Sequence, residues 1–422
     1  MNVWALRSTD EVIEKARAAK TASLGLGIAP SNARSEALRA MAEALDHNID
    51  LIVKENEKDI AELEKKDPDS PLVDRLLLDR KRIQEITDSL RQVAELADPL
   101  GEIVEGWRTR QGLEIRKVRV PLGVIAVIYE ARPNVTVDII GLAIKSGNAV
   151  ILRGGSEAIN SNKALVRVVK ESIGGLIPEG AIQLVENTDR ALVDRLLELN
   201  ECIDVVIPRG SAQLIRFVRE NSRVPIIETG AGNVHIFVNN DADLDMATKI
   251  IINAKTQRPS VCNAVRKVLI HSGVAKIYLP QLVNSLRQHH VAVKGCERSR
   301  DIEHSLIEAK EEDWYEEYMD LTLAVKIVDS VQEAIEHINR YGTHHSDAII
   351  TSNINDANLF TLLVDSSTVY VNASTRFTDG NQFGFGAEVG ISTQKLHARG
   401  PMGLKELTTT KYIVFGNGQV RE

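Results

Sequence analysis

The sequence predicts an α/β fold with two domains, each built on a parallel sheet. Strand-like and helix-like segments alternate along most of the chain after the first hundred or so residues, which is the pattern of βαβ units. Val124 to Ile128 is a continuous apolar run, as expected for a strand that is buried on both faces of a parallel sheet. At 422 residues the chain is long enough for two to three domains.

The amino-terminal part, from Ser8 to about Ala97, predicts helices. Pro30-Ser31-Asn32 is a helix start signal. Apolar residues then recur at helical spacing on one face, which contains Ala37, Leu38, Met41, Ala42 and Leu45. The charged faces of these helices are expected to be solvated surface, and no chemistry is assigned to this segment.

A β-hairpin is predicted between Gly106 and Leu122. Apolar and charged residues alternate there, and Gln111-Gly112 supplies a turn. An exposed ribbon presents unpaired backbone groups, so this hairpin is expected to serve in oligomerisation.

The composition excludes several classes of partner. The 51 basic and 59 acidic residues give a net charge of −8 without a block of like charge, which argues against nucleic acid and anionic membranes. Cys202, Cys262 and Cys296 have no C-x-x-C spacing, so neither a disulfide framework nor a metal site is expected. The amino terminus lacks an apolar targeting region and no run approaches the roughly 20 residues of a membrane span. A cytoplasmic protein is expected.

Two loops that follow predicted strands are candidates for a phosphate site. The strand Ala149 to Leu152 ends in Arg153-Gly154-Gly155-Ser156, and the strand Ile203 to Ile207 ends in Pro208-Arg209-Gly210-Ser211. Backbone N–H groups at a helix amino terminus can bind phosphate, and an arginine adds further donors. No G-x-G-x-x-G is present, so simple glycine turns and a nucleotide site are about equally supported.

Two residues further along are candidates for catalysis. Glu228 ends a predicted strand, Val224 to Glu228, beside a glycine-rich bend; it could be a general base or only a loop hydrogen-bond acceptor. Cys262 lies in A-K-T-Q-R-P-S-V-C-N-A-V-R, between a helical run and an apolar strand. It is a nucleophile if its surroundings keep it as a thiolate, and otherwise a buried structural thiol.

The last third of the chain predicts a second α/β domain and a long irregular segment. Strands and helices alternate from Val268 to Val371. Asn372 to Leu404 is rich in glycine and hydroxyl side chains and contains Arg376, His397 and Arg399. Such a segment is expected to be an ordered binding loop.

Four of these stretches resemble the gamma-glutamyl phosphate reductase family of the aldehyde dehydrogenase superfamily. They are Y-E-A-R-P-N-V-T (Tyr129 to Thr136), E-T-G-A-G-N-V-H (Glu228 to His235), T-Q-R-P-S-V-C-N-A around Cys262, and the segment from Asn372 to Leu404. The resemblance covers the whole chain.

The resemblance implies an aldehyde dehydrogenase-like fold with two parallel-sheet α/β domains. Residues 1–105 and 123–254 would form a Rossmann-like NADP-binding domain, and residues 255–385 a catalytic domain with the nucleophilic cysteine. Residues 106–122 and about 400–422 would form a small hairpin and tail for oligomerisation.

The same resemblance implies an NADP-dependent oxidoreductase of proline biosynthesis. It would use NADPH to reduce L-glutamyl 5-phosphate to L-glutamate 5-semialdehyde and phosphate through a cysteine thioester. A homodimer or homotetramer is implied, and a separate glutamate 5-kinase is a further expected partner. Two alternatives remain at this stage: a hydrolytic, NAD-linked aldehyde dehydrogenase, and a non-catalytic nucleotide-binding protein on the same fold.

Carried over to this chain, the resemblance makes Cys262 the nucleophile. Asn134 would be the side-chain half of the oxyanion hole, although Arg132 competes for that position. Glu228 would correspond to the general base that hydrolyses the thioester; hydrolysis would only regenerate glutamate, so its part in the reductive reaction stays open. Arg376 and Arg399 would hold the substrate, since arginine forks match carboxylate and phosphate, or else form salt bridges within the loop.

The implied cofactor residues lie in the two glycine loops and near the second domain. Arg153 would contact the 2′-phosphate of NADP, and Glu317 the nicotinamide ribose. The full set is Arg153, Gly154, Gly155, Ser156, Arg209, Gly210, Ser211 and Glu317.

Overall fold

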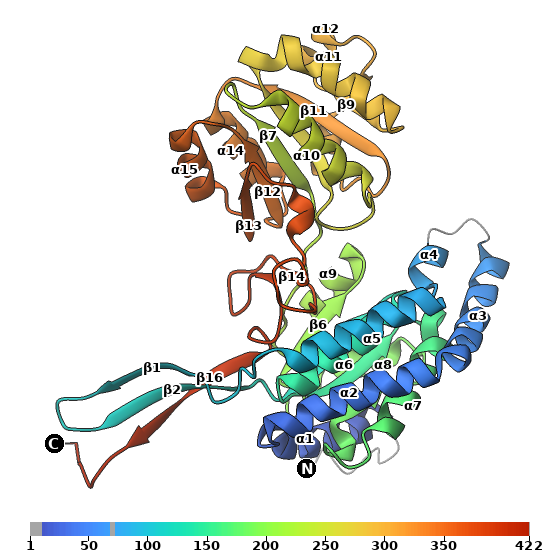
Figure 1. The fold of residues 1–422 in the computed structure, drawn as a ribbon, viewed down its shortest axis with the longest axis vertical. Coiled ribbons are helices and arrows are strands. Elements are labelled where there is room, and N and C mark those ends of the chain that lie inside the picture. Colours follow the sequence, from blue (N-terminus) through green and yellow to red (C-terminus); the bar gives the residue numbers. More distant parts are fainter. Residues whose placement is uncertain (1–10, 68–71, 422) are drawn as a thin grey trace. The chain divides into compact units, whose positions relative to one another are not determined.

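The computed structural model describes residues 11–67 and 72–421, which divide into two compact units (Figure 1). Unit 1 runs from Met1 to Thr229 and includes Gly384–Gly390 and Met402–Glu422; unit 2 comprises Gly230–Phe383 and Ile391–Pro401. The first division therefore falls at residues 229/230, earlier than the 254/255 expected from the sequence. The physical reason is strand pairing, because the strand after Gly230 belongs to the sheet of unit 2.

Unit 1 contains a parallel sheet with the strand order β5-β4-β3-β6. Its apolar core packs the side chains of β3 and β4 against helix α1, among them Val124, Ala126 and Ile151. All six residues of β3 are buried, as the continuous apolar run predicted. The strands are β3 (Val124–Tyr129), β4 (Ala149–Gly154), β5 (Ile182–Leu184) and β6 (Val205–Arg209).

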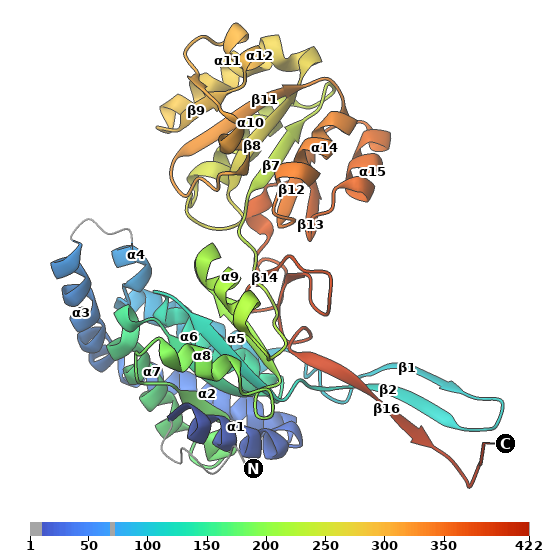
Figure 2. The same ribbon diagram turned by 180° about the vertical axis from the view of Figure 1, so that it is seen from behind.

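Helices precede and separate these strands (Figures 1 and 2). Helix α6 starts at Pro133, whose fixed φ suits the first turn, and Ser211 caps α9 by accepting the N–H of Leu214. The helices are α1 (Glu11–Gly27), α2 (Ser31–His47), α3 (Ile49–Lys66), α4 (Leu72–Leu76), α5 (Arg80–Glu95), α6 (Pro133–Lys145), α7 (Ile159–Ser172), α8 (Ala191–Leu197) and α9 (Ala212–Asn221).

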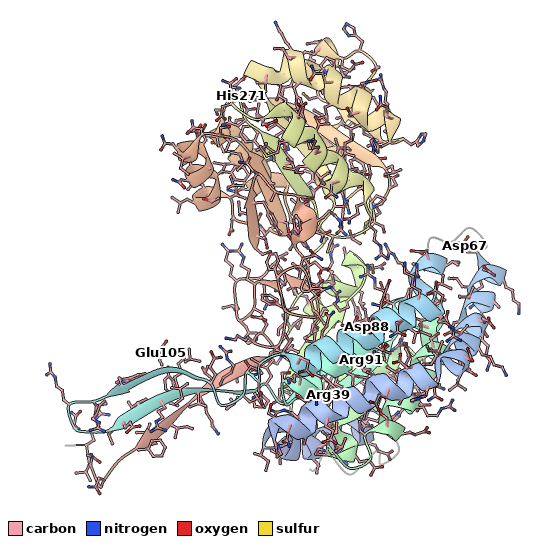
Figure 3. All side chains as sticks on the ribbon, in the orientation of Figure 1. Arg39, Asp67, Asp88, Arg91, Glu105 and His271 are labelled. Carbon is pink, nitrogen blue, oxygen red and sulfur yellow. The ribbon has the colours of Figure 1, made fainter. Side chains whose placement is uncertain are left out.

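The charged faces of α2 and α5 are solvated, as expected from the sequence. Asp88 and Arg91 of α5 form an ion pair of 3.1 Å on this surface (Figure 3). Arg39 of α2, also labelled there, lies 2.7 Å from Glu95. Exposed pairs of this kind contribute little to stability.

An antiparallel ribbon extends from the helical part of unit 1 in both views (Figures 1 and 2). Strands β1 (Ile103–Arg108) and β2 (Glu114–Pro121) form the predicted hairpin, and the tail strand β16 (Thr408–Phe415) pairs with the other edge of β2. The indole of Trp107 lies edge-on to the ring of Tyr412, with ring centroids 6.1 Å apart. The hairpin and tail that the sequence grouped together thus form one sheet.

Unit 2 is built on a parallel sheet with the order β10-β9-β11-β8-β7-β12-β13. Alternate residues of β7 enter different cores: Ile236 packs on the side of α10 and α11, and Phe237 on the side of α14 and α15. The strands are β7 (Val234–Val238), β8 (Val265–His271), β9 (Ala292–Gly295), β10 (Ile307–Glu308), β11 (Thr322–Val328), β12 (Ser346–Ile350) and β13 (Thr368–Val371).

The helices of unit 2 cover both faces of this sheet (Figure 2). They are α10 (Leu244–Thr256), α11 (Ser272–Gln288), α12 (Glu297–Ile302), α13 (Glu311–Tyr315), α14 (Val331–Tyr341) and α15 (Ile354–Leu363). The expected second α/β domain is therefore present.

Two segments differ from the sequence-based expectation. Val224 to Glu228 is not a strand; it makes a single bridge, from Ile226 to Val206, beside β6. The segment from Asn372 to Leu404 is largely irregular, as expected, but its parts are divided between the units. It also contains a short pair, β14 (Ile391–Ser392) with β15 (Gly400–Pro401).

Candidate active site

Cys262 lies at the amino-terminal edge of the sheet of unit 2. Helix α10 ends at Thr256 and β8 begins at Val265, so the cysteine occupies the turn between them. The N–H of Ala264 donates to the carbonyl of Val261 at 3.1 Å, which closes the turn around the thiol. The residue is half-buried, so a reactant can reach it.

Gly232, just before β7, packs against the main chain of Cys262. A Cβ atom at Gly232 would overlap the carbonyl group of Cys262. The absence of a side chain is therefore required for this close approach of two backbone segments. Gly232 thus supports the cysteine turn through its backbone.

Glu317 is held by groups that also contact the cysteine turn. Its carboxylate accepts the N–H of Gly232 at 2.8 Å and lies 3.8 Å from the guanidinium of Arg266. Glu317 is about one-fifth exposed, so one face of the carboxylate is accessible. The structure therefore brings together Cys262 and Glu317, which the sequence named separately.

Arg376 completes this part of the site. Its Nε donates to Oε1 of Gln257 at 3.0 Å, and its Nη1 donates to Oδ1 of Asn263, the residue after the cysteine. Burial lowers the pKa of Arg376, while the negative charge of a Cys262 thiolate acts in the opposite direction.

Arg399 has a different environment. Its guanidinium donates to Oδ1 of Asp365 at 2.7 Å and to the carbonyl oxygen of the same residue at 3.1 Å. Hydrogen bonds from Lys395 and Arg399 lower the pKa of Asp365 to about 2. This is the salt bridge that the sequence left as the alternative for this arginine.

In unit 1, Asn134 lies in the first turn of α6 and its amide is oriented by a carboxyl group. Nδ2 donates to Oδ2 of Asp138, one helical turn later, at 3.4 Å. Burial raises the pKa of Asp138 to about 6. The preceding loop is strained, since Ala131 has a φ of +35°, and its N–H donates to Glu157 at 2.6 Å. Arg132, the residue before Pro133, occupies the N-cap position of α6, but its side chain makes no capping hydrogen bond.

Glu228 also lies in unit 1, beside helix α9. Its carboxylate is 3.6 Å from the guanidinium of Arg219, and its side chain is 29% exposed. The neighbouring Thr229 hydroxyl donates to the carbonyl of Pro208 at 2.8 Å. These two contacts hold the segment of Glu228, the general base expected from the resemblance.

The glycine segments of unit 1 lie at the ends of β4 and β6 and flank the end of β3; Arg153, Gly154 and Arg209 belong to these strands, which extend further than the sequence predicted. In this sheet the chain order reverses between β3 and β6, which is where ligands bind in open parallel sheets. Arg153 is 7% exposed, and its guanidinium donates to the carbonyls of Gly154 and Thr188. Its Nε and that of Arg209 are buried without a partner among the described residues. These orphaned donors fit an anionic group such as a dinucleotide phosphate.

A carboxylate also lies in this region and was missed by the sequence analysis. Glu130, directly after β3, accepts the N–H of Ser211 at 2.7 Å and the hydroxyl of Ser211 at 3.2 Å. A Cβ at Gly210 would meet the carboxylate of Glu130. A phosphate at this loop would have to share or displace the Glu130 contact. Glu130 and Ser211 meet because β3 and β6 are neighbours in the sheet. The sequence does not give the strand order, so it could not have revealed this residue.

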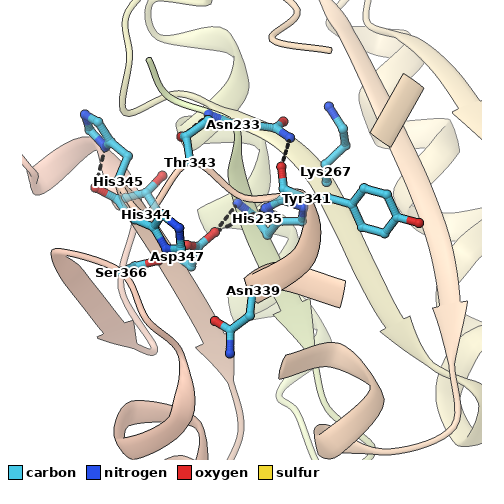
Figure 4. A network of polar contacts seen from close by, with 12 residues as sticks. Asn233, His235, Lys267, Asn339, Tyr341, Thr343, His344, His345, Asp347 and Ser366 are labelled. Atoms are coloured by element: carbon cyan, nitrogen blue, oxygen red, sulfur yellow. Dashed lines mark hydrogen bonds and ion pairs between the residues drawn. The ribbon is translucent and has the colours of Figure 1, made fainter. Parts of the chain in front are cut away.

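Unit 2 also contains a buried polar network around Asp347 (Figure 4). Asp347 of β12 accepts the backbone N–H of His235 at 2.7 Å and the hydroxyl of Ser366. The Nδ1 atom of His235 is 3.2 Å from Oδ1 of Asp347 but lacks hydrogen-bond geometry. Burial raises the pKa of Asp347 to about 7 and lowers that of His235 to about 3.

This network predicts a pH-dependent effect of Asp347→Asn on stability. The pKa of Asp347 in the folded protein exceeds its ordinary value of 3.8. Its contribution to the free energy of unfolding is therefore fully present below pH 3.8 and is lost as the pH rises through about 7. Asparagine does not ionise. The free energy of unfolding of the variant, relative to the parent, should therefore rise between these pH values by a few kcal/mol, at most about 4.

Urea unfolding at several pH values measures this difference. Asp329→Asn is a matched control, because a hydrogen bond from Arg298 lowers the pKa of Asp329 to about 2, so its effect should stay constant above about pH 5 and change only below it. A difference for Asp347→Asn that does not change with pH would show that the carboxyl group titrates normally.

Two general findings concern the described ranges 11–67 and 72–421. No helix there is long and apolar enough to cross a membrane. The same ranges contain no group of three or more His, Cys, Asp and Glu side chains that could hold a metal ion.

Two parallel-sheet units, with a cysteine turn beside an acidic residue in the second, define the class of aldehyde dehydrogenase-like α/β oxidoreductases. The family model "Aldehyde dehydrogenase family" matches residues 3–324. The chain is 54% identical to the gamma-glutamyl phosphate reductase of Dictyoglomus thermophilum and 56% identical to that of Caldanaerobacter subterraneus subsp. tengcongensis, in each case over 98% of this chain and 100% of the relative.

A solved structure gives the same result. The crystal structure of gamma-glutamyl phosphate reductase from Thermotoga maritima matches with a TM-score of 0.95 and 50% identity, over 98% of this chain and 100% of that chain. The chain therefore belongs to the aldehyde dehydrogenase family and, within it, to the gamma-glutamyl phosphate reductases. Enzymes of the aldehyde dehydrogenase family use a nicotinamide cofactor. The fold expected from the sequence is thus confirmed.

Proposed function

We propose that the protein reduces L-glutamyl 5-phosphate to L-glutamate 5-semialdehyde and phosphate with NADPH, as a step of proline biosynthesis. The observation that carries this proposal is the identity of 54–56% to proteins named gamma-glutamyl phosphate reductase over nearly the whole of both chains. The packing of Gly232, Glu317 and Arg376 around the turn of Cys262 supports it.

The first step is attack of the Cys262 thiolate on the acyl carbon. A carbon–sulfur bond forms, the bond from the acyl carbon to the phosphate oxygen breaks, and phosphate leaves with the electron pair. Arg376, next to the thiolate, is placed to attract the anionic substrate. The product of this step is a thioester on Cys262.

Stabilisation of the oxyanion is assigned to the amide of Asn134 and the backbone N–H of Cys262. Each well-placed donor contributes on the order of 3–4 kcal/mol to transition-state stabilisation. The hydrogen bond from Asn134 to Asp138 would hold the amide in a fixed orientation. Arg132, at the cap of the same helix, is the second candidate for this position.

The cofactor would be held by the loops of Arg153 to Ser156 and Arg209 to Ser211, with Glu317 on the nicotinamide ribose. Arginine at position 153 suits a 2′-phosphate, and hence NADPH. When bound, NADPH supplies the hydride that reduces the thioester. Collapse of the resulting thiohemiacetal restores the Cys262 thiolate and releases the semialdehyde. Glu228, paired with Arg219, is not required on this path, because hydrolysis of the thioester would return glutamate.

Substitution of the proposed substrate anchor is expected to weaken binding. In Arg376→Ala, KM for the acyl phosphate or semialdehyde should rise by roughly 10- to 100-fold, since a hydrogen bond to a charged group contributes about 1.5–3 kcal/mol. Steady-state kinetics measure this change. Arg399→Ala is the matched comparison and should change KM less, because Arg399 is already paired with Asp365. An unchanged KM in Arg376→Ala would assign the anchor elsewhere.

A phosphate-dependence assay tests the function. In the reverse direction, with semialdehyde and NADP, turnover should require phosphate or arsenate and should be faster with NADP than with NAD. Turnover without either anion would identify a hydrolytic aldehyde dehydrogenase, and no turnover under any condition would support a non-catalytic nucleotide-binding protein.

Oligomerisation is proposed to use the ribbon of β1, β2 and β16. Its two edge strands expose apolar side chains, and exposed edges of this kind commonly pair with another chain. Among them are Ile103, Trp107, Tyr412, Val414 and Phe415. A dimer or tetramer is the expected assembly, and a separate glutamate 5-kinase would supply the labile substrate.

A further inference from the structure

Arg266 lies at an irregularity of the sheet next to the cysteine turn. Val234 of β7 pairs with Val265 of β8, but the next residue, His235, pairs with Lys267. Arg266 is therefore the extra residue of a β-bulge. Bulges are found beside active sites, where they redirect side chains. Here the consequence is that Arg266 and Lys267 both contact the segment Glu316 to Asp320.

The guanidinium of Arg266 clamps the turn that carries the thiol. Nη2 donates to the carbonyl of Val261, immediately before Cys262, at 2.8 Å, and Nη1 donates to the carbonyl of Ala264 at 3.0 Å. The side chain is fully buried. Because the guanidinium is planar and its donors are fixed, these two bonds restrict the turn from both sides of the cysteine.

The same guanidinium connects the turn with the proposed cofactor contact. It lies 3.8 Å from the carboxylate of Glu317, which also accepts the N–H of Gly232. Lys267 holds the same segment by donating to the carbonyl of Glu316 at 2.6 Å. Arg266 thus contacts both the thiol turn and Glu317, whereas the hydrogen bond of Lys267 goes to the carbonyl of Glu316.

Burial of the Arg266 guanidinium costs free energy of folding, which suggests that this side chain has a function. Desolvation lowers the pKa of Arg266, and its Nε has no partner among the described residues. A buried cation with an unsatisfied donor destabilises the fold unless nearby negative charge compensates. Glu317 supplies part of this compensation, and a thiolate at Cys262 supplies more.

We propose that Arg266 is a positioning residue that fixes the turn of Cys262 and favours the thiolate form of its side chain. This inference rests on the proposed function, in which Cys262 is the nucleophile. The charged groups of this unit that act on the thiol or on the two arginines beside it include Lys255, Arg258, Arg266, Lys267, Glu317, Asp320, Arg376 and Asp379.

The test is the rate of alkylation of Cys262 by iodoacetamide as a function of pH, followed by mass spectrometry of the peptide that contains this residue. Arg266→Gln removes the charge and should raise the midpoint of the pH profile by about one unit or more. Arg266→Lys loses the two guanidinium bonds to the carbonyls of Val261 and Ala264, so its midpoint should also rise, by less than in Arg266→Gln. Lys267→Met removes the adjacent buried lysine, which donates to the carbonyl of Glu316 and not to the turn, and should move the midpoint less than Arg266→Gln does.

Folding of each full-length variant is verified by circular dichroism. A folded Arg266→Gln variant with the parental midpoint would overturn the proposal. If that variant does not fold, Arg266→Lys decides, because a folded lysine variant with the parental midpoint would also contradict the role assigned to Arg266. The assay contains neither substrate nor cofactor, so its result is independent of the phosphate-dependence assay of the proposed function.

Discussion

Replacing Cys262 by serine is expected to lower turnover on the order of 10⁴-fold or more, as the removal of a catalytic nucleophile does in other enzymes. A serine hydroxyl is not ionised near neutral pH, whereas a thiol beside Arg266 and Arg376 is favoured as the thiolate. The ester formed by serine would also be less reactive toward hydride than a thioester. The measurement is kcat in the phosphate-dependent reverse assay.

The other two cysteines provide the controls. Cys202 is buried in the core of unit 1, and Cys296 precedes helix α12, so neither belongs to the turn of Cys262. Cys202→Ser and Cys296→Ser should keep turnover within a few-fold of the parent. Mass spectrometry with the acyl phosphate should detect a glutamyl adduct on Cys262 in the parent but not in Cys262→Ser. Turnover of Cys262→Ser within tenfold of the parent would exclude the thioester path.

The sequence could predict the elements whose patterns are local. The apolar run of β3 and the alternation of β1 and β2 determine strand type within a few residues, and both elements were confirmed. The segment Val224 to Glu228 is also apolar, apart from Pro225 and its final glutamate, yet it makes only one bridge with β6. Whether such a segment becomes a strand depends on its pairing partners, which are distant in sequence. The division at 229/230 follows from the same cause, because β7 pairs with β8 and β12.

The candidate site was predictable only in its chemically distinctive residues. Cys262 and Glu317 stood out because the resemblance gives them roles, and the structure brings both to Gly232. Arg266 has no local signal, since two adjacent charged residues, Arg266 and Lys267, at the start of an apolar strand look like an exposed edge. Its burial depends on the bulge in the pairing with β7, a property of two segments together.

Gly232→Ala is expected to lower kcat/KM by on the order of 10²- to 10³-fold, although the change adds only one methyl group. A Cβ at this position would overlap the main-chain carbonyl of Cys262, so either β7 or the cysteine turn must move. A misplacement of reacting groups by about 1 Å can cost 10²-fold in rate. The shift would also lengthen the bond from the Gly232 N–H to Glu317, so cofactor affinity should fall together with the rate.

The matched control is Gly27→Ala, where the added Cβ would meet only a ring carbon of Pro121 at 3.5 Å, an ordinary contact. This variant should keep kcat/KM within about twofold of the parent, since surface substitutions away from special features change stability by only about 0.5 kcal/mol. Thermal unfolding of both variants separates misplacement from unfolding: Gly232→Ala should remain folded while its Cys262 is alkylated at an altered rate. Parental activity in folded Gly232→Ala would show that the backbone of Gly232 does not support the nucleophile, and Glu317 would then have to be positioned through Arg266 alone.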